Sequence, residues 1–256
     1  MKQNFNGKMY DNLENELKNF VDSKSFDVLY LASSNFAQFF NANFPQMIIS
    51  TLKKIMEDKT IIVPTFSFDF CDTGRYSIKE SGTFCGGISS LFLKDPDVER
   101  TIYPPMHNVA IWGKLQSKFL NKKYESSFGE NSIFNDLNNY KTLVLLIDCS
   151  FDDGVPFVHC LEDKYNASYR YEKSFKGVIL DKNNNIIPYT FKRQMRKKGT
   201  VLSAEKLGDM FYSSKYVKVK HYEMSKFVLF DLRDFYKFFD PIFKKNPDVM
   251  EDGLWR

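Results

Sequence analysis

The sequence lacks the patterns that mark several common protein classes. Its 256 residues include four cysteines without a CxxC pair and only three histidines, so neither a disulfide framework nor a zinc site is indicated. No stretch reaches the ~20 apolar residues of a membrane span, and residues 1–20 lack the apolar run of a signal peptide. We therefore expect a soluble cytoplasmic protein with reduced thiols and no bound metal.

Motifs of several enzyme classes are missing too. There is no GxSxG of a serine hydrolase, no GxGxxG and no Walker sequence. The net charge of +4 is small and dispersed, which argues against a nucleic-acid binder but suits a site for a small polyanion. Phe (26) and Tyr (14) are abundant. We attribute them mainly to the codon bias of an AT-rich genome rather than to stacking on nucleic-acid bases. Exposed aromatic residues are also compatible with a homodimer interface.

The order of apolar segments predicts an α/β protein. Residues 27–32, 60–66 and 142–148 are compact apolar runs typical of buried strands, and helical spacing covers 9–23 and 45–57. A loop-rich stretch at 67–85 precedes further short helices, which we expect at 87–93, 113–121, 131–138 and 203–212, with a closing amphipathic helix within 231–248.

The pattern changes from about residue 174. Residues 175–180 and 186–192 flank the turn sequence Asp181–Asn185, which predicts a hairpin, and an alternating segment VKVKHYEM follows further on. The expected fold is a mixed central sheet flanked by helices with an antiparallel C-terminal portion. We expect one two-lobed domain over 1–256, with the active site in 1–173 and a C-terminal part in 174–256.

His159 and Glu162 are the first candidates for chemistry. Pro156 opens the segment PFVHCLEDKYN, which predicts a short helix, and helix positions three apart share a face. A carboxylate bonded to one ring nitrogen fixes the histidine tautomer and strengthens the other nitrogen as a base. HxxE often occurs by chance, so from the spacing alone an incidental surface ion pair is the ordinary interpretation.

Serine and aspartate residues follow two of the predicted strands. Ser33 and Ser34 stand where hydroxyl and backbone N–H groups can hold phosphate or carbonyl oxygens, or can simply cap a turn. Asp148, Asp152 and Asp153 could bind a cationic or polyol acceptor, or form a solvated loop. Both interpretations stay open for each group.

The densest basic run is FKRQMRKKG, residues 191–199. A solvated face is the ordinary interpretation of such a run. The alternative is contact with a phosphate-bearing ligand.

Taken in order, these segments resemble the aminoglycoside 3-N-acetyltransferase family of coenzyme A-dependent enzymes, across about residues 10–250. The matching pieces are DVLYLASSNF, IIVPTFSFDF, ESGTFCGGISSLFL with DVERTIYPPMHNVAIWGK, SSFGENSIFNDL and FVHCLEDKYNASYRYEK. They stand where the family has a strand before His-Ser-Ser, its Pro-Thr-Phe strand, its Arg-Ser-x-His-Pro segment, its Ser-Phe-Gly-Glu segment and its catalytic His and Glu. The branch found among bacterial surface-polysaccharide genes is the most similar.

The resemblance implies direct acetyl transfer from acetyl-coenzyme A to an amino sugar or sugar nucleotide. His159 would be the general base and Glu162 would orient it, while Thr65 is a candidate donor to the oxyanion. The remaining assignments are cofactor binding by Ser33, Ser34, Arg100 and Asn108, and acceptor binding by Asp69, Asp148, Asp152 and Asp153.

The sequence also departs from the family pattern. Ala32 replaces the histidine of His-Ser-Ser, Tyr103 stands in a segment that has lost its histidine, Asn108 replaces a serine, and Pro156 replaces a threonine. These changes favour an acceptor other than an antibiotic. They leave two alternatives open, namely the same fold with a different activated donor, and an inactive carbohydrate-binding relative.

Overall fold

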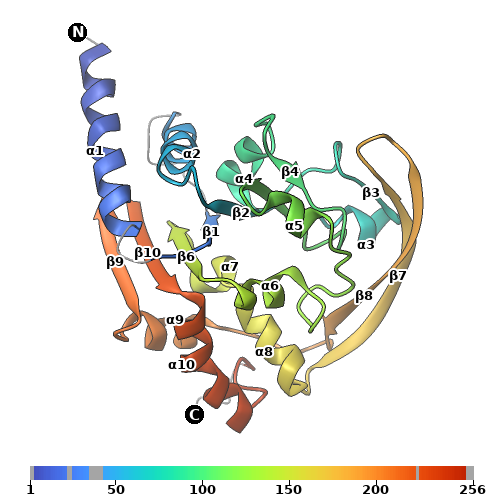
Figure 1. The fold of residues 1–256 in the computed structure, drawn as a ribbon. Helices are drawn as coiled ribbons and strands as arrows, with labels where there is room; N and C mark the ends of the chain where they lie inside the picture. The colour runs from blue at the N-terminus through green and yellow to red at the C-terminus, as the bar shows by residue number, and fades with distance from the viewer. Residues whose placement is uncertain (1–2, 22–24, 35–42, 223–224, 252–256) are drawn as a thin grey trace.

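Seven strands form one mixed sheet in the order β4-β5-β2-β1-β6-β10-β9 (Figure 1). The computed structural model describes residues 3–21, 25–34, 43–222 and 225–251, with side chains from residue 12 onward. β1 is parallel to β2 and β6, whereas β5 and β10 run antiparallel to β2 and β6. The strands are β1 (Val28–Ser33), β2 (Thr60–Pro64), β4 (Glu99–Arg100), β5 (Val109–Gly113), β6 (Thr142–Ile147), β9 (Val217–Tyr222) and β10 (Ser225–Asp231).

A second, three-stranded sheet stands beside the first, in the order β3-β7-β8. Its strands are β3 (Arg75–Ser77), β7 (Arg170–Leu180) and β8 (Ile186–Arg196). β7 and β8 form a long antiparallel ribbon, and Asp181 accepts hydrogen bonds from the backbone N–H groups of Asn183 and Asn185 in the connecting turn. The predicted hairpin is therefore confirmed, with both strands longer than expected.

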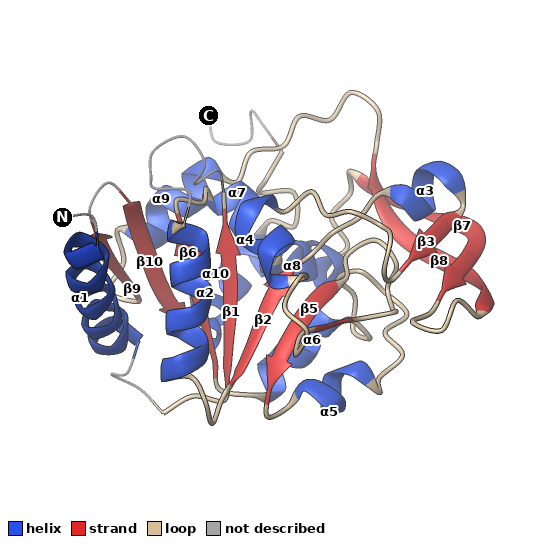
Figure 2. Ribbon diagram, turned by 90° about the horizontal axis from the view of Figure 1, so that it is seen from above, coloured by secondary structure: helices blue, strands red, loops and turns tan. Residues whose placement is uncertain are grey.

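Helices cover both faces of the seven-stranded sheet (Figure 2). The side chains of the central strands β1, β2 and β6 are all buried, as their continuous apolar sequences predict. One face packs against α1 (Gln3–Val21), α2 (Phe44–Ile55) and α4 (Gly86–Phe92). The other packs against α5 (Gln116–Leu120), α6 (Ile133–Asp136), the 3₁₀ turn Leu137–Asn139, α7 (Phe151–Gly154), α8 (Phe157–Tyr165), α9 (Glu205–Tyr212) and α10 (Leu232–Lys245).

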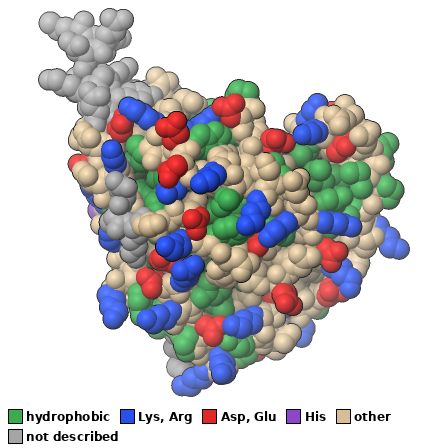
Figure 3. All heavy atoms as spheres, in the orientation of Figure 1, with side chains coloured by type: hydrophobic (Ala, Val, Ile, Leu, Met, Phe, Trp, Pro, Cys, Tyr) green, Lys and Arg blue, Asp and Glu red, His purple; other side chains and the backbone are tan. Residues whose placement is uncertain are grey.

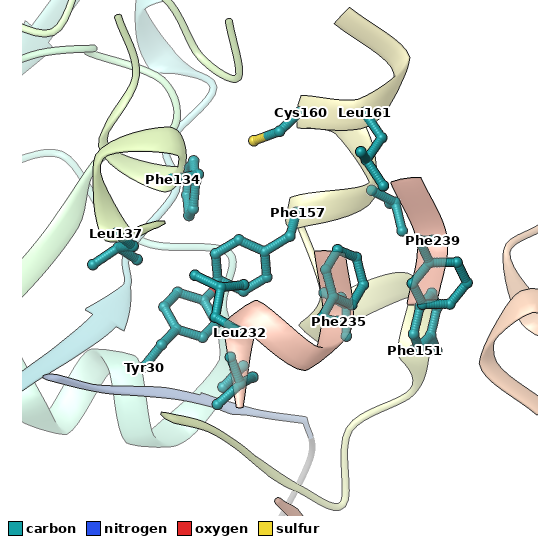
Figure 4. Packing of buried hydrophobic residues seen from close by; sticks show 14 of the residues in the cluster. Tyr30, Phe134, Leu137, Phe151, Phe157, Cys160, Leu161, Leu232, Phe235 and Phe239 are labelled. Atoms are coloured by element: carbon teal, nitrogen blue, oxygen red, sulfur yellow. The ribbon is translucent and has the colours of Figure 1, made fainter. Parts of the chain in front are cut away.

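Aromatic side chains fill the second of these layers. Phe157 of α8 packs edge-to-face on Tyr30 of β1, at 5.2 Å between ring centroids, and also contacts Phe235 of α10 (Figure 4). Phe151 and Phe239 extend the same cluster. Large aromatic residues bury more apolar area than aliphatic ones, so core packing accounts for much of the aromatic excess in the sequence.

The sequence-based expectations miss several elements. The stretch at 67–85 contains α3 (Asp69–Thr73) and β3 rather than loop alone, and β5 and β10 were not predicted. The expected boundary near residue 173 lies inside β7, and the C-terminal strands β9 and β10 extend the sheet that β1 begins. The antiparallel C-terminal portion is thus confirmed, but it is shared between both sheets.

No helix in the described part of the chain is long and apolar enough to cross a membrane. On the face that Figure 3 presents, Lys and Arg side chains are interspersed with Asp and Glu.

Candidate active site

A cleft of about 780 Å³ lies between α8, the loop at residues 126–128 and the β7–β8 ribbon. The cleft lies between the two sheets, because α8 packs against one face of the seven-stranded sheet and the ribbon belongs to the three-stranded sheet. The polar side chains that line it include His107, Ser127, Asp152, His159, Glu162, Asp163, Arg170, Glu172, Arg193 and Arg196.

His159 and Glu162 meet on α8, as their spacing predicts. Nδ1 of His159 lies 2.7 Å from Oε2 of Glu162. The helix buries Phe157 and Leu161 in the core, which leaves the imidazole at the cleft with 29% of its side chain exposed, while only 2% of Glu162 is exposed. The histidine can therefore reach a ligand and the carboxylate cannot.

The chain returns after α8 to complete the surroundings of Glu162. Asn166 adopts the left-handed conformation that ends the helix. Tyr169 then donates its hydroxyl to Oε1 at 2.5 Å, and Arg170 donates from one terminal nitrogen to both carboxylate oxygens, at 2.7 and 3.0 Å. Neither Tyr169 nor Arg170 was identified from the sequence, although they lie only three and four residues after the asparagine that ends the helix.

These contacts fix the charge of Glu162. Burial alone would raise the pKa of this carboxyl group, but His159, Arg170 and Tyr169 outweigh burial and lower the pKa to about 2. The carboxylate is therefore ionised and can only accept hydrogen bonds.

An acceptor-only Glu162 determines the tautomer of neutral His159. Nδ1 must carry the proton that bridges to the carboxylate, so Nε2 keeps its lone pair. A terminal nitrogen of Arg170 also approaches Nδ1, at 3.3 Å. That distance is longer than the 2.7 Å to Glu162, and both nitrogens are donors, so it is a close approach rather than a competing hydrogen bond.

His107 and Ser127 form a second polar pair in the cleft. The Nδ1 atom of His107 lies 2.5 Å from the Ser127 hydroxyl, and the two residues are 6% and 3% exposed. The sequence gives no local signal for this pair, because the two residues come from different loops. His107 is one of only three histidines, which is the one feature that could have drawn attention to it.

Thr65, Arg100 and Asn108 come together, but away from the cleft lining. Asn108 Oδ1 accepts hydrogen bonds from the Thr65 hydroxyl and from Nε of Arg100, each at 2.7 Å. The terminal nitrogens of Arg100 donate to the backbone carbonyls of Thr65, Ser81 and Gly82. The guanidinium is thus buried and satisfied by protein atoms, which gives these residues a structural task besides any role toward a ligand.

Ser33 and Ser34 lie at the end of β1 and are not among the residues that line the cleft. The Ser33 hydroxyl is buried without a hydrogen-bond partner in the described structure. Gly86 begins α4 close by with a positive φ of 86°, and a Cβ atom there would lie 3.3 Å from the Ser33 carbonyl oxygen. A buried hydroxyl without a partner is costly, which sets this atom apart from the other polar groups of the site.

Asp152 lines the cleft and Asp153 does not. Oδ1 of Asp152 accepts a hydrogen bond from the backbone N–H of Ala204 at 2.9 Å, which orients the carboxylate. Asp153 instead exchanges hydrogen bonds with Ser150, the N-cap residue of α7. Of the three predicted aspartates at 148–153, the structure places only Asp152 in the same cleft as His159.

Asp148 and Asp69 also lie outside the cleft lining. Asp148 has a positive φ of 47° and binds the start of β10 through the Ser225 hydroxyl and the Lys226 N–H. Asp69 is the first residue of α3. Asp148 therefore clips β6 to β10, a contact that joins residues 77 positions apart.

The basic run contributes two arginines to the cleft, Arg193 and Arg196 of β8. Arg196 stands opposite Arg170 in the β7–β8 register, where like charges disfavour each other. Neither Arg193 nor Arg196 forms an ion pair within the described residues, whereas Lys192 pairs with Glu172 at 2.9 Å. The β8 side of the cleft therefore presents two arginines that suit an anionic group, while the carboxylates of Asp152, Asp163 and Glu172 line the same cleft. The described residues hold no group of three or more His, Cys, Asp or Glu placed to bind a metal.

Comparison with known proteins gives a consistent result. The family model for aminoglycoside 3-N-acetyltransferase matches residues 36–244. Three similar solved structures are YokD from Bacillus subtilis (20% identity, TM-score 0.75, 93% of each chain covered), the acetyltransferase AAC(3)-IIb (12%, 0.76, 93% of this chain and 97% of that one) and AAC-IIIb in binary complex with CoASH (13%, 0.74, 92% and 96%). A comparison with curated proteins finds no match.

The class of the protein follows from this match together with the fold: it is an acyltransferase. The family model covers well over half of the chain. The chain belongs to the aminoglycoside 3-N-acetyltransferase family.

Proposed function

We propose that this protein transfers the acetyl group of acetyl-coenzyme A to the amine of an amino sugar or sugar nucleotide of the kind built into surface polysaccharide. The observation that carries the proposal is the oriented pair of His159 and Glu162 at the wall of the cleft. His159 is the general base of the reaction, and Glu162 holds its tautomer and orientation.

Acetyl-coenzyme A is the co-substrate and supplies the acetyl group as an activated thioester. The residues present fit such a polyanionic ligand, because Arg193 and Arg196 line the cleft and form no ion pair among the described residues. The unpartnered hydroxyl of Ser33 offers a further hydrogen bond. Ser34 follows it in the chain. The other predicted cofactor-binding residues act indirectly, because the hydrogen bonds among Thr65, Arg100 and Asn108 hold their own segments together.

His159 acts by taking a proton. An ammonium has no lone pair, so the acceptor must attack as the free amine, and its nitrogen then loses an N–H proton as it bonds to the acetyl carbon. Nε2 of His159 accepts that proton, and the ionised Glu162 stabilises the resulting imidazolium. The bond between carbon and sulfur breaks, and the departing thiolate can take the proton back from His159. A positioned base of this kind contributes ~10²–10⁴ in rate.

The β8 side of the cleft favours an anionic group on the acceptor. Arg193 and Arg196 would attract a phosphate there, while the carboxylates of Asp163 and Glu172 line the same cleft. Asp152, with its carboxylate held by the Ala204 N–H, offers a partner for an amine or a sugar hydroxyl. The other three predicted acceptor-binding residues do not line the cleft. Their contribution to acceptor binding is indirect, through the elements that contain them: Asp69, Asp148 and Asp153.

Thiol release from acetyl-coenzyme A, measured across a panel of amino sugars, their nucleotide derivatives and aminoglycosides, tests the proposal. We expect turnover with amino sugars or sugar nucleotides and the highest kcat/KM with a phosphate-bearing acceptor. Arg196→Gln should lower kcat/KM selectively for that acceptor. Turnover confined to aminoglycosides would contradict the proposed acceptor. Absence of coenzyme A binding in calorimetry would contradict the donor and favour a different activated donor or a carbohydrate-binding role.

A further inference from the structure

The reaction just proposed leaves the buried pair of His107 and Ser127 without a task. Both residues line the same cleft as His159, and the 2.5 Å separation of Nδ1 and Oγ is that of a strong hydrogen bond. Phe128 lies between this pair and the base, since its ring centroid is 4.5 Å from that of His107 and 4.9 Å from that of His159. The pair and the base therefore share one wall of the cleft.

His107 is uncharged at neutral pH. Burial lowers the pKa of its imidazole well below 6.5, and the positive charges of Arg193 and Arg170 lower it further. A neutral imidazole has one N–H group and one lone pair. Its ring is held by packing as well, edge-on to Phe66 at 4.9 Å.

The hydrogen-bond inventory of the pair leaves one donor unused in either tautomer. If Nδ1 accepts the Ser127 hydroxyl proton, the N–H at Nε2 is free. If Nδ1 carries the proton and donates to Ser127, the serine O–H is free. Nε2 of His107 has no hydrogen-bond partner among the described residues, so one uncharged donor faces this part of the cleft in both cases.

The surroundings of this donor favour negative charge. The guanidinium groups of Arg193 and Arg170, which lower the pKa of His107, would also stabilise an oxygen that gains electron density nearby. Thr65, by contrast, directs its hydroxyl inward to Asn108. Fixed donors at a position of developing charge are a large contribution to acyl transfer, because they need no reorganisation during the reaction.

We propose that Ser127 and His107 together donate a hydrogen bond to the thioester carbonyl oxygen and stabilise the negative charge that it gains as the amine attacks. This inference rests on the proposed acetyl transfer. It adds two catalytic residues to that reaction. His159 removes a proton from the amine, whereas His107 and Ser127 stabilise the negative charge on the carbonyl oxygen.

The alternative of a serine nucleophile with His107 as its base is disfavoured by the same contacts. A base must accept a proton, and the cations around His107 oppose a positive charge on its ring. The donor interpretation therefore predicts no acetylated serine. Mass spectrometry of the protein after incubation with acetyl-coenzyme A checks this directly, and an acetyl group on Ser127 would overturn the inference.

Steady-state kinetics of thiol release provides the main test. Ser127→Ala and His107→Phe, which keeps the ring packing, should each lower kcat at least ~10-fold and up to ~10²-fold, with KM for acetyl-coenzyme A changed less than about twofold. The double variant should lose no more than the worse single variant, because the two side chains act as one donor. Ser132→Ala is the matched control. Ser132 is equally buried and caps α6 outside the cleft, so its loss should leave kcat unchanged.

A spectroscopic measurement separates this role from a structural one. With ¹³C-labelled acetyl-coenzyme A bound and no acceptor present, the carbonyl stretch should lie at lower frequency in the wild-type protein than in Ser127→Ala. Wild-type kcat in both single variants, or an unshifted stretch in all proteins, would overturn the inference while leaving the acetyl transfer intact. Failure of the wild-type protein to release thiol with every acceptor would instead overturn the proposed function.

Discussion

Glu162 Oε2 lies 2.7 Å from Nδ1 of His159, and this contact decides which ring nitrogen can act as a base. The carboxylate also receives Tyr169 and Arg170, so its charge and its position are both fixed. An imidazole held in this way presents its other nitrogen to the cleft without rearrangement. The proposed base therefore depends for its tautomer on a residue that is itself only 2% exposed.

Glu162→Gln should reduce stability as well as activity. The change leaves Arg170 without its carboxylate, and we expect a loss of ~2–3 kcal/mol in the free energy of unfolding at about pH 7. Because the pKa of Glu162 is about 2 in the folded protein and near its ordinary value when unfolded, its contribution is complete above that ordinary value and is lost as the pH falls toward 2. In urea unfolding, the difference in the free energy of unfolding between wild type and variant should therefore become smaller as the pH falls from about 5 to about 2.

The matched control for that experiment is Glu80→Gln. Glu80 pairs with Arg75 at 3.1 Å on the surface, where both side chains are more than half exposed. Exposed pairs contribute little, so this variant should unfold like the wild-type protein. A gap for Glu162→Gln that stays constant with pH would contradict the assignment of an ionised, hydrogen-bonded carboxylate.

Asp152→Asn and Asp153→Asn separate a carboxylate in the cleft from its neighbour outside it. Loss of one charge-assisted hydrogen bond to the acceptor should raise the acceptor KM about tenfold in Asp152→Asn. Asp153→Asn alters only the cap of α7 and should leave the acceptor KM unchanged. Equal effects of the two substitutions in steady-state kinetics would remove Asp152 from the acceptor site.

Arg100→Met distinguishes a structural arginine from one that binds the cofactor. The side chain makes hydrogen bonds to Asn108 and to three backbone carbonyls, so its removal should cost on the order of 2–4 kcal/mol of stability. We expect the dissociation constant for coenzyme A, measured by calorimetry on the folded variant, to change less than about threefold. A large loss of coenzyme A affinity at unchanged stability would show instead that Arg100 contacts the cofactor directly.

Much of the sheet could be predicted from the sequence because its central strands are buried on both faces. The runs at 27–32 and 142–148 correspond to β1 and β6, which pair in parallel along six residues. β5 and β10 escaped prediction because a run of about five apolar residues has no periodicity that separates a strand from a buried helix. Their pairing with β2 and β6 joins distant parts of the chain, so it cannot be predicted from either segment alone.

In the candidate site, too, contacts within one helix could be predicted from the sequence, whereas contacts between distant segments could not. His159 and Glu162 are three positions apart on one helix, so spacing predicted their contact. Ser127 reaches His107 across 20 residues, and Asp148 reaches Ser225 across 77, contacts that depend on how loops and strands assemble. The Arg193 and Arg196 side chains enter the cleft only because β8 is longer than the predicted strand.

The most direct test of the account is the rate of thiol release from acetyl-coenzyme A in His159→Ala, compared with the wild-type protein and with His221→Ala. His221 is an exposed histidine of β9 outside the cleft, so its removal should leave the rate unchanged. We predict that His159→Ala lowers kcat by ~10²–10⁴-fold while it still binds coenzyme A. Wild-type kcat in His159→Ala would contradict the assignment of His159 as the base.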